Sequence, residues 1–203
     1  LSLGNTYWEQ DLLDFDERVR KLIGSDFEYV CELKFDGVAI GLTYQHGKLV
    51  RAVTRGDGMQ GDDVTANVKT IRSIPLKLLP GDYPDEFEIR GEIFMPRPVF
   101  DKLNTELYDQ LKEDGYDEDE IADRLLKNPR NAAAGTVKMQ DSKSVSKRSL
   151  DCFLYFIYGE NLPFKTHYES IKKARQWGFK VSDYTVKVNS IKNVFDFINE
   201  WDH

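Results

Sequence analysis

Three charged residues, Glu32, Lys34 and Asp36, are spaced two apart in the stretch CELKFDGVAIGL at positions 31–42. Residues two apart on an extended strand point to the same side, and apolar residues fill the alternate positions here. The pattern predicts a hydrophobic strand that carries an acid, a base and a second acid on one face.

A lysine on such a face could act as a covalent nucleophile. Only the free amine attacks, whereas the ordinary pKa of a lysine is about 10.4. Burial and a nearby cation both lower that pKa. The alternative is a structural ion pair between Lys34 and one of its neighbouring carboxylates. The short pattern K-x-D-G does not by itself decide between these two hypotheses.

The hydrophobic pattern around these residues predicts the elements that must position them. Strands are expected at 28–44, 48–54, 86–95 and 150–159, and helices at 11–23, 64–71, 96–113, 167–177 and 190–202. Gly24 can close the first helix, and residues 45–47 can form a hairpin turn. Hairpins come early and helices late, which favours an α+β fold with antiparallel sheets over a doubly wound parallel sheet.

Composition limits the function classes. The chain has 203 residues and a net charge of −7, so it is not a uniformly basic nucleic-acid clamp. No apolar run approaches the roughly 18 residues that span a bilayer, and the N-terminal residues lack a signal-peptide pattern. Cys31 and Cys152 lie in apolar runs, which indicates buried thiols in a reducing cytoplasm rather than a disulfide framework or a zinc site.

Two segments have opposite charge. Residues 113–124, EDGYDEDEIADR, are expected to form an acidic, solvated surface element. The stretch 127–148 contains six basic residues and one acid, Asp141. This basic stretch is the best local candidate for a phosphate-contacting surface, and the alternative is an ordinary solvated loop.

An ordered series of motifs resembles the adenylation domain of bacterial NAD-dependent DNA ligases. The series is LSLGNTY at 1–7, ELKFDG at 32–37, TRGDGMQGDDVTANVKTIRSIPLKL at 54–78, EIRGEIFM at 88–95 and NPRNAAAGTVKMQD at 128–141. The resemblance implies the nucleotidyltransferase fold of covalent ligases, with two antiparallel sheets and an active-site cleft between them. It also implies NAD as AMP donor, Mg²⁺, nicked duplex DNA as substrate, and a monomeric, cytoplasmic enzyme of DNA replication and repair.

The resemblance assigns roles to the charged face. Lys34 would attack the adenylyl phosphorus of NAD, releasing nicotinamide mononucleotide and leaving a lysyl–AMP intermediate. The AMP would pass to the 5′-phosphate at a nick, where the 3′-hydroxyl displaces it. Glu32 would accept a hydrogen bond from the adenine amino group. Asp36 would serve a metal ion or the 3′-hydroxyl, and Gly37 would leave room for the nucleotide.

Four more residues match nucleotide contacts of the family. Ser2 and Leu3 would line the nucleotide site, with a frayed terminus as the alternative. Arg55, which opens the RGDG loop, would contact the nucleotide through its forked guanidinium. Glu92 would contact the ribose of the adenylate, since a glutamate in such a strand needs a polar partner.

Two residues of the basic stretch match the family near the site. Arg130 looks like the family arginine of the NPRN motif. Lys138 stands where many members have arginine, so a phosphate contact there keeps its charge but loses the bidentate fork. The metal ligands are not identified by any motif.

The resemblance also shapes the expected domain organisation. Residues 1–203 are expected to form one adenylation domain that is incomplete at its C-terminal side. The helical domain that holds nicotinamide mononucleotide in the family is expected to be missing from it, so these residues alone should be inactive with NAD. Two alternatives stay open: an ATP-dependent ligase or capping-type nucleotidyltransferase, and a catalytically incomplete nucleotide-binding fragment.

Overall fold

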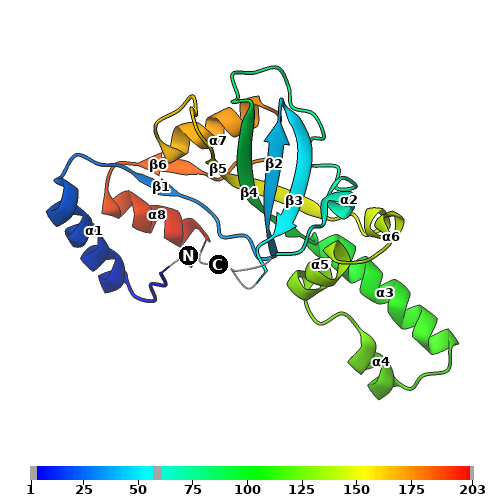
Figure 1. The fold of residues 1–203 in the computed structure, drawn as a ribbon. Helices are drawn as coiled ribbons and strands as arrows, with labels where there is room; N and C mark the ends of the chain where they lie inside the picture. Colours follow the sequence, from blue (N-terminus) through cyan, green and yellow to red (C-terminus); the bar gives the residue numbers. More distant parts are fainter. Residues whose placement is uncertain (1–3, 57–60, 202–203) are drawn as a thin grey trace. The chain divides into compact units, whose positions relative to one another are not determined.

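Four antiparallel strands form the main sheet, in the order β3-β2-β4-β5 (Figure 1). Strands β2, β3, β4 and β5 span Val38–Gln45, Lys48–Thr54, Glu86–Phe94 and Asp151–Tyr158. The hairpin between β2 and β3 turns at His46 and Gly47, which both have positive φ angles of 46° and 71°. Two such residues are typical of the turn whose twist matches antiparallel strands. The predicted hairpin and antiparallel arrangement are confirmed.

The sequence is described by a computed structural model over residues 4–56 and 61–201. The chain divides into two compact units. One unit contains the residues up to Leu33 together with those from Asp183 onward, and the other is Lys34–Ser182. In the described part of the chain, no helix combines the length and the apolar character needed to cross a membrane.

The main sheet buries one face. Leu42, Tyr44 and Ile89 are completely or almost completely inaccessible to solvent, and they alternate with residues that stay partly exposed. Burying one such side chain contributes about 1.5–3 kcal/mol to folding. Trp177 packs against this face with its ring centroid 5.3 Å from that of Phe87. The core of the second unit therefore lies on one side of the sheet.

Helices of the second unit surround the sheet. Helices α2, α3, α4, α5, α6 and α7 span Thr65–Val68, Arg97–Glu113, Glu118–Arg124, Pro129–Val137, Ser142–Lys147 and His167–Gln176. Helix α7 packs on β5, whereas α5 packs on β4 and β2. The acidic segment 113–124 is mostly exposed and includes α4, as predicted. Helices α5 and α6, within the basic stretch, were not predicted from the hydrophobic pattern.

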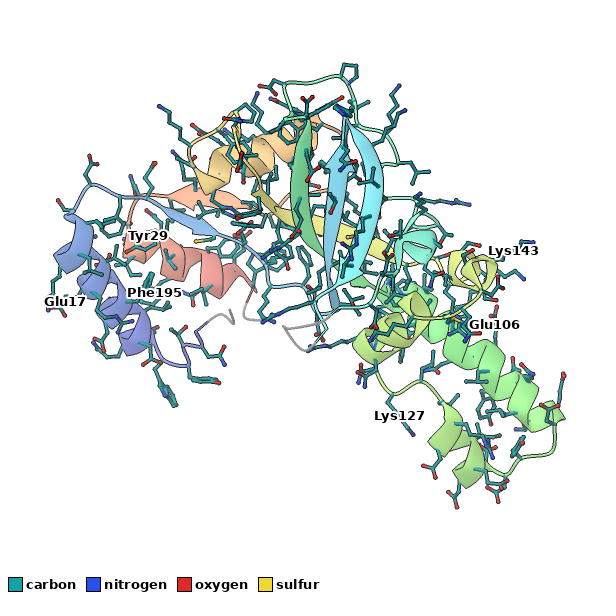
Figure 2. The ribbon with its side chains drawn as sticks, viewed as in Figure 1. Glu17, Tyr29, Glu106, Lys127, Lys143 and Phe195 are labelled. Carbon is teal, nitrogen blue, oxygen red and sulfur yellow. The ribbon has the colours of Figure 1, made fainter. Side chains whose placement is uncertain are left out.

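The first unit pairs two short strands with two helices. Helices α1 and α8 span Glu9–Ile23 and Ile191–Trp201, and strands β1 and β6 span Tyr29–Cys31 and Val186–Val188. Gly24 ends α1 with a φ of 87°, as its position predicts. The hydroxyl of Tyr29, labelled in Figure 2, donates a hydrogen bond to the Asp16 carboxylate of α1. This bond ties β1 to α1.

The predicted long strand over 28–44 is wrong. Strand β1 ends at Cys31, β2 begins at Val38, and residues 32–37 belong to neither strand. The boundary between the two units falls within this interval, after Leu33. The two strands belong to different sheets: β1 pairs with β6 in the first unit, whereas β2 pairs with β3 and β4 in the second. Cys31 and Cys152 are free and buried, as predicted.

Candidate active site

The motif segment at 32–37 keeps the alternation that its sequence predicts, although it is not a strand. Glu32, Lys34 and Asp36 are exposed, Leu33 and Phe35 are half-buried between them, and Gly37 is buried. The charged residues are therefore displayed by an extended linker rather than by a ladder of strand hydrogen bonds. Glu32 belongs to the first unit, and Lys34 and Asp36 belong to the second.

Gly37 is required by the backbone of β4. A Cβ atom at this position would lie 2.1 Å from the carbonyl oxygen of Ile93, a distance that no real Cβ contact allows. The family resemblance assigns this glycine to the space of the nucleotide, but the structure gives it a second reason. Its lack of a side chain lets the motif segment approach β4 closely.

Glu92 interacts with several other residues of the site in the second unit. It lies on the partly exposed face of β4 and accepts a hydrogen bond from the backbone N–H of Gly37. Burial raises the pKa of its carboxyl group, and the nearby charge of Asp36 acts in the same direction. The Gly37 bond and the positive charges of Lys34 and Arg130 oppose this shift. Three charged side chains, those of Lys34, Asp36 and Arg130, thus act on this carboxylate.

Arg130 comes to this place from the start of α5. The Asn128 side chain caps the helix by accepting from the backbone N–H of Asn131 at 2.7 Å, and Pro129 occupies the first helical position. Arg130 Nη1 lies 3.3 Å from Asp36 Oδ1. The NPRN motif is therefore a helix start that brings a guanidinium to the lysine motif.

Arg55 follows β3 on the same side of the sheet. Its backbone N–H donates to the carbonyl of Ala39 at 3.1 Å, and Ala39 is the cross-strand partner of Glu92. The positive charge of Arg55 also influences Tyr155 on β5. Arg55 is thus close to the row of residues that contains Glu92.

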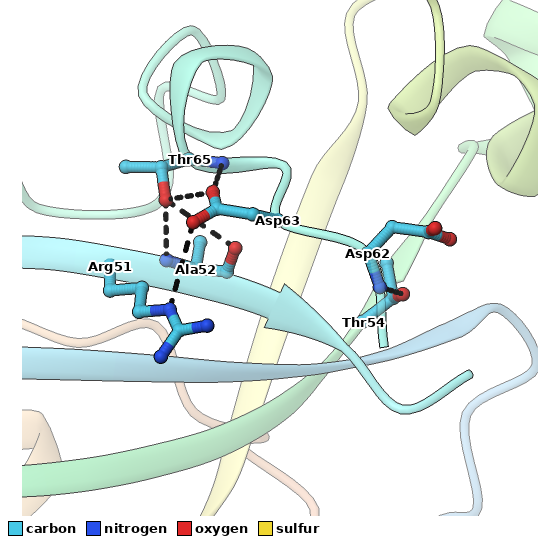
Figure 3. A network of polar contacts seen from close by, with 6 residues as sticks. All are labelled: Arg51, Ala52, Thr54, Asp62, Asp63 and Thr65. Carbon is cyan, nitrogen blue, oxygen red and sulfur yellow. Dashed lines mark hydrogen bonds and ion pairs between the residues drawn. The ribbon is translucent and has the colours of Figure 1, made fainter. Parts of the chain in front are cut away.

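The glycine-rich loop after Arg55 is fixed to β3 where it ends. Figure 3 shows the contacts: the Thr65 hydroxyl accepts from the backbone N–H of Ala52 at 2.9 Å and donates to Asp63 at 2.6 Å. The backbone N–H of Asp62 donates to the Thr54 hydroxyl at 3.0 Å. These bonds hold the returning end of the loop against the strand that precedes it. Loop residues 57–60 lie outside the described residues.

Tyr155 is a site residue that the sequence did not reveal. The pairing of β4 with β5 shifts between Arg90 and Gly91, where Tyr155 is the extra residue of β5. Such a bulge changes the direction in which a side chain points. Burial raises the pKa of the Tyr155 hydroxyl, and the negative charge of Glu92 raises it further. The aromatic run 153–158 contains this residue, but a bulge leaves no signal in the hydrophobic alternation.

Lys138 lies just after α5, beside Asp62. Its ammonium forms an ion pair with Asp62 at 2.7 Å, and both side chains are largely exposed. No contact with Lys34 or Glu92 is shown for it. Its place just after α5 puts it beside the end of the glycine-rich loop. Two other lysines of the basic stretch, Lys127 and Lys143, extend from the segment before α5 and from α6 (Figure 2).

Three predicted residues are not among the described residues of the second unit. Ser2 and Leu3 lie outside the described residues. Glu32 is exposed in the first unit. Two surface hollows, of about 640 and 380 Å³, are lined by other residues than Lys34 and Glu92.

The charges of this face suit a phosphate ester. Lys34 offers an amine, Arg55 and Arg130 offer guanidinium groups, and Glu92 and Asp36 offer carboxylates for hydroxyl or metal partners. Within residues 4–56 and 61–201, no three His, Cys, Asp or Glu side chains gather into a metal site. Fold and face together define an α+β domain with antiparallel sheets that presents a lysine among arginines and carboxylates.

Comparison with known proteins identifies the family. A model of the NAD-dependent DNA ligase adenylation domain matches residues 1–203. Relatives include DNA ligases of Phocaeicola vulgatus, Bacteroides fragilis and Flavobacterium johnsoniae, which are 55%, 54% and 52% identical over 202 residues. The alignments cover 100%, 100% and 99% of this chain and 29%, 29% and 28% of the relatives. The chain belongs to the NAD-dependent DNA ligase adenylation domain family, which confirms the resemblance of its motifs.

Proposed function

We propose that the protein containing this chain is a DNA ligase that seals nicks in duplex DNA with NAD. The observation that supports this proposal is that Lys34, Glu92 and Arg130 lie together at one face of the main sheet. The chain that contains them belongs to the family. Because the chain spans less than a third of the length of the curated relatives, this activity belongs to the whole protein. The family favours NAD over ATP as the nucleotide donor.

In the proposed first step, the Lys34 amine attacks the adenylyl phosphorus of NAD. The bond between the adenylyl phosphorus and the bridging oxygen breaks, and nicotinamide mononucleotide leaves with that oxygen and its electron pair. The proton that the amine loses passes to solvent as the phosphoramidate forms. Arg130 and Arg55 neutralise charge on the phosphate, and Glu92 accepts a hydrogen bond from the ribose. Glu32, Ser2 and Leu3 are proposed to contact the nucleotide as the family motifs imply, and the Tyr155 ring offers a flat surface for the base.

The later steps transfer AMP to a 5′-phosphate and join it to the 3′-hydroxyl. The basic stretch, including Lys138, is proposed to contact the phosphates of nicked DNA. Magnesium usually binds through one or two carboxylates together with substrate phosphates. The exposed Asp36 carboxylate fits that role and would hold the ion beside the nucleotide, where it neutralises phosphate charge.

The detailed fold, the oligomeric state and the cellular location of the protein are also proposals. The nucleotidyltransferase fold with a cleft between its two sheets agrees with the α+β architecture and with the family. A monomer is proposed from the family resemblance, and a cytoplasmic location agrees with the two free, buried cysteines.

The test uses the whole protein and intact mass spectrometry. Incubation with NAD and magnesium should add one AMP, and peptide mapping should place it on Lys34, whereas ATP should add none. Lys34→Ala should lose the adduct. Lys102→Ala, which removes an exposed lysine of α3, should keep it. An adduct on another lysine, or one formed only from ATP, would contradict the proposal.

A further inference from the structure

The nucleophile segment lies between two strands rather than within one. Residues 32–36 belong to no strand, and β2 begins only at Val38. The Gly37 N–H donates to the Glu92 carboxylate at one end of the segment. Adenylyl transfer nevertheless requires the Lys34 amine to be held in line with a phosphorus atom. Something must fix the segment between Lys34 and Gly37.

Phe35 makes such a contact, in addition to the ion pair of Asp36 with Arg130. Its ring lies 4.3 Å from the ring of Phe153 on β5, measured between centroids, with only 19° between the planes. The Phe94 ring on β4 lies 6.3 Å from Phe35 and 5.3 Å from Phe153, again in stacked orientations. Three rings from three separate parts of the chain thus form one stack on the sheet.

The Phe153 ring of this stack is held in place by further contacts. Phe153 is the cross-strand partner of Glu92, so it lies in the same row of the sheet as the carboxylate that binds Gly37. The Lys180 ammonium lies 4.8 Å from the centroid of the Phe153 ring and pairs with Asp151. A cation over an aromatic face stabilises that arrangement. The ring that Phe35 contacts is therefore held by its own strand and by a neighbouring cation.

Anchoring Phe35 fixes both of its neighbours. In the extended segment, Lys34 and Asp36 are exposed while Phe35 is half-buried, so the two charged side chains point away from the stack. The ring contact and the Gly37 hydrogen bond then hold the segment at two points two residues apart. Aromatic stacking gives this anchor a preferred plane, which an aliphatic side chain lacks.

We propose that Phe35 is a positioning residue for the nucleophile: its stack with Phe153 and Phe94 fixes the backbone that carries Lys34. This inference rests on the proposed adenylyl transfer. It predicts that the rate of lysine adenylation depends on an aromatic ring at position 35, whereas NAD binding depends on it much less.

The test measures single-turnover AMP transfer to the whole protein over a range of NAD concentrations, well below the lowest melting temperature of the variants. Phe35→Leu should lower the maximal rate constant roughly 10- to 100-fold. The NAD concentration for half-maximal rate should change less than about threefold, because the nucleotide contacts remain. Phe35→Tyr should restore most of the rate. Backbone hydrogen exchange at Gly37, whose N–H is bonded to Glu92, should speed up in Phe35→Leu and return towards wild type in Phe35→Tyr.

Two further variants separate positioning from general stability. Phe153→Leu removes the other half of the stack without touching the motif, and its effect should not add to that of Phe35→Leu. Phe156→Leu is the matched control, because this ring lies on the same strand but is stacked on His167, and it should leave the rate unchanged.

The outcomes are distinguishable. A wild-type protein that gains no AMP on Lys34 would overturn the proposed function itself. A wild type that is adenylated normally, with Phe35→Leu equally fast, would overturn only the positioning role. Equal rate losses in Phe35→Leu, Phe35→Tyr and Phe156→Leu would also overturn it, because the ring stack would then have no special part.

Discussion

Arg130 and Asp36 lie 94 positions apart in the sequence, yet Nη1 of the arginine is 3.3 Å from Oδ1 of the aspartate. The two side chains are 61% and 74% exposed. An exposed ion pair of this kind contributes only about 0.2–1 kcal/mol to stability. Its importance is therefore geometric: it joins the NPRN helix start to the lysine motif and leaves the guanidinium accessible to a phosphate.

Replacing Arg130 should separate activity from stability. Arg130→Ala is expected to lower the free energy of unfolding by less than about 1 kcal/mol. The rate of adenylyl transfer should fall roughly 10²-fold, because a charge that stabilises the transition state is lost. Denaturant unfolding and single-turnover adduct formation measure the two effects. Arg97→Ala, which removes an exposed ion pair of α3, is the control. An unchanged transfer rate in Arg130→Ala would remove Arg130 from the site.

Gly37 should be intolerant of the smallest substitution. Gly37→Ala is expected to reduce the free energy of unfolding by about 2–3 kcal/mol, because its Cβ would meet the Ile93 carbonyl. Gly135→Ala in α5 is the matched control, since nothing lies within 4 Å of a Cβ there. Alanine in a helix interior should stabilise by about 0.5–1 kcal/mol relative to glycine. Equal melting temperatures for the two variants would mean that β4 does not approach Gly37 so closely.

Glu92 should give the protein a specific dependence on pH. Burial raises the pKa of Glu92 above its ordinary value of 4.5. The folded state therefore holds this proton more tightly than the unfolded state. The resulting stability is fully present below the unfolded pKa and is lost as pH rises through the folded pKa.

Glu92→Gln removes this titration and retains an oxygen that can accept from Gly37. As pH rises from about 4 towards neutrality, the free energy of unfolding of the wild type should therefore fall relative to that of Glu92→Gln. Denaturant titrations at a series of pH values measure it. Parallel curves for the two proteins would show that Glu92 titrates normally.

Glu32 should contribute to the choice of base. Glu32→Ala is expected to weaken binding of the adenosine moiety to the whole protein by about 1.5–3 kcal/mol, because a charged acceptor for the adenine amino group is lost. Calorimetric titration with AMP measures the change. Glu28→Ala, at another exposed acid of the first unit, provides the comparison. If AMP affinity stays at the wild-type value, Glu32 faces elsewhere.

Much of the architecture follows from local patterns in the sequence. Helix α1 and its end at Gly24, the β2–β3 hairpin, β4, α3 and β5 were all predicted, because hydrophobic period and turn residues act over a few neighbours. The ordered motifs also identified the family from the sequence alone. The short helices α5 and α6 were not predicted, because small residues such as those of NAAAG give little hydrophobic periodicity.

The site itself was only partly determined by the sequence. The alternation at Glu32, Lys34 and Asp36 predicted which side chains are exposed, but not that the segment lies outside both sheets. The contact of Arg130 with Asp36 and the bulge at Tyr155 depend on how separate elements pack. So does the need for glycine at position 37, which arises from a carbonyl 56 positions later. Local sequence fixes the conformations that neighbouring residues impose on each other, whereas contacts between distant residues exist only once the core has brought their strands and helices together.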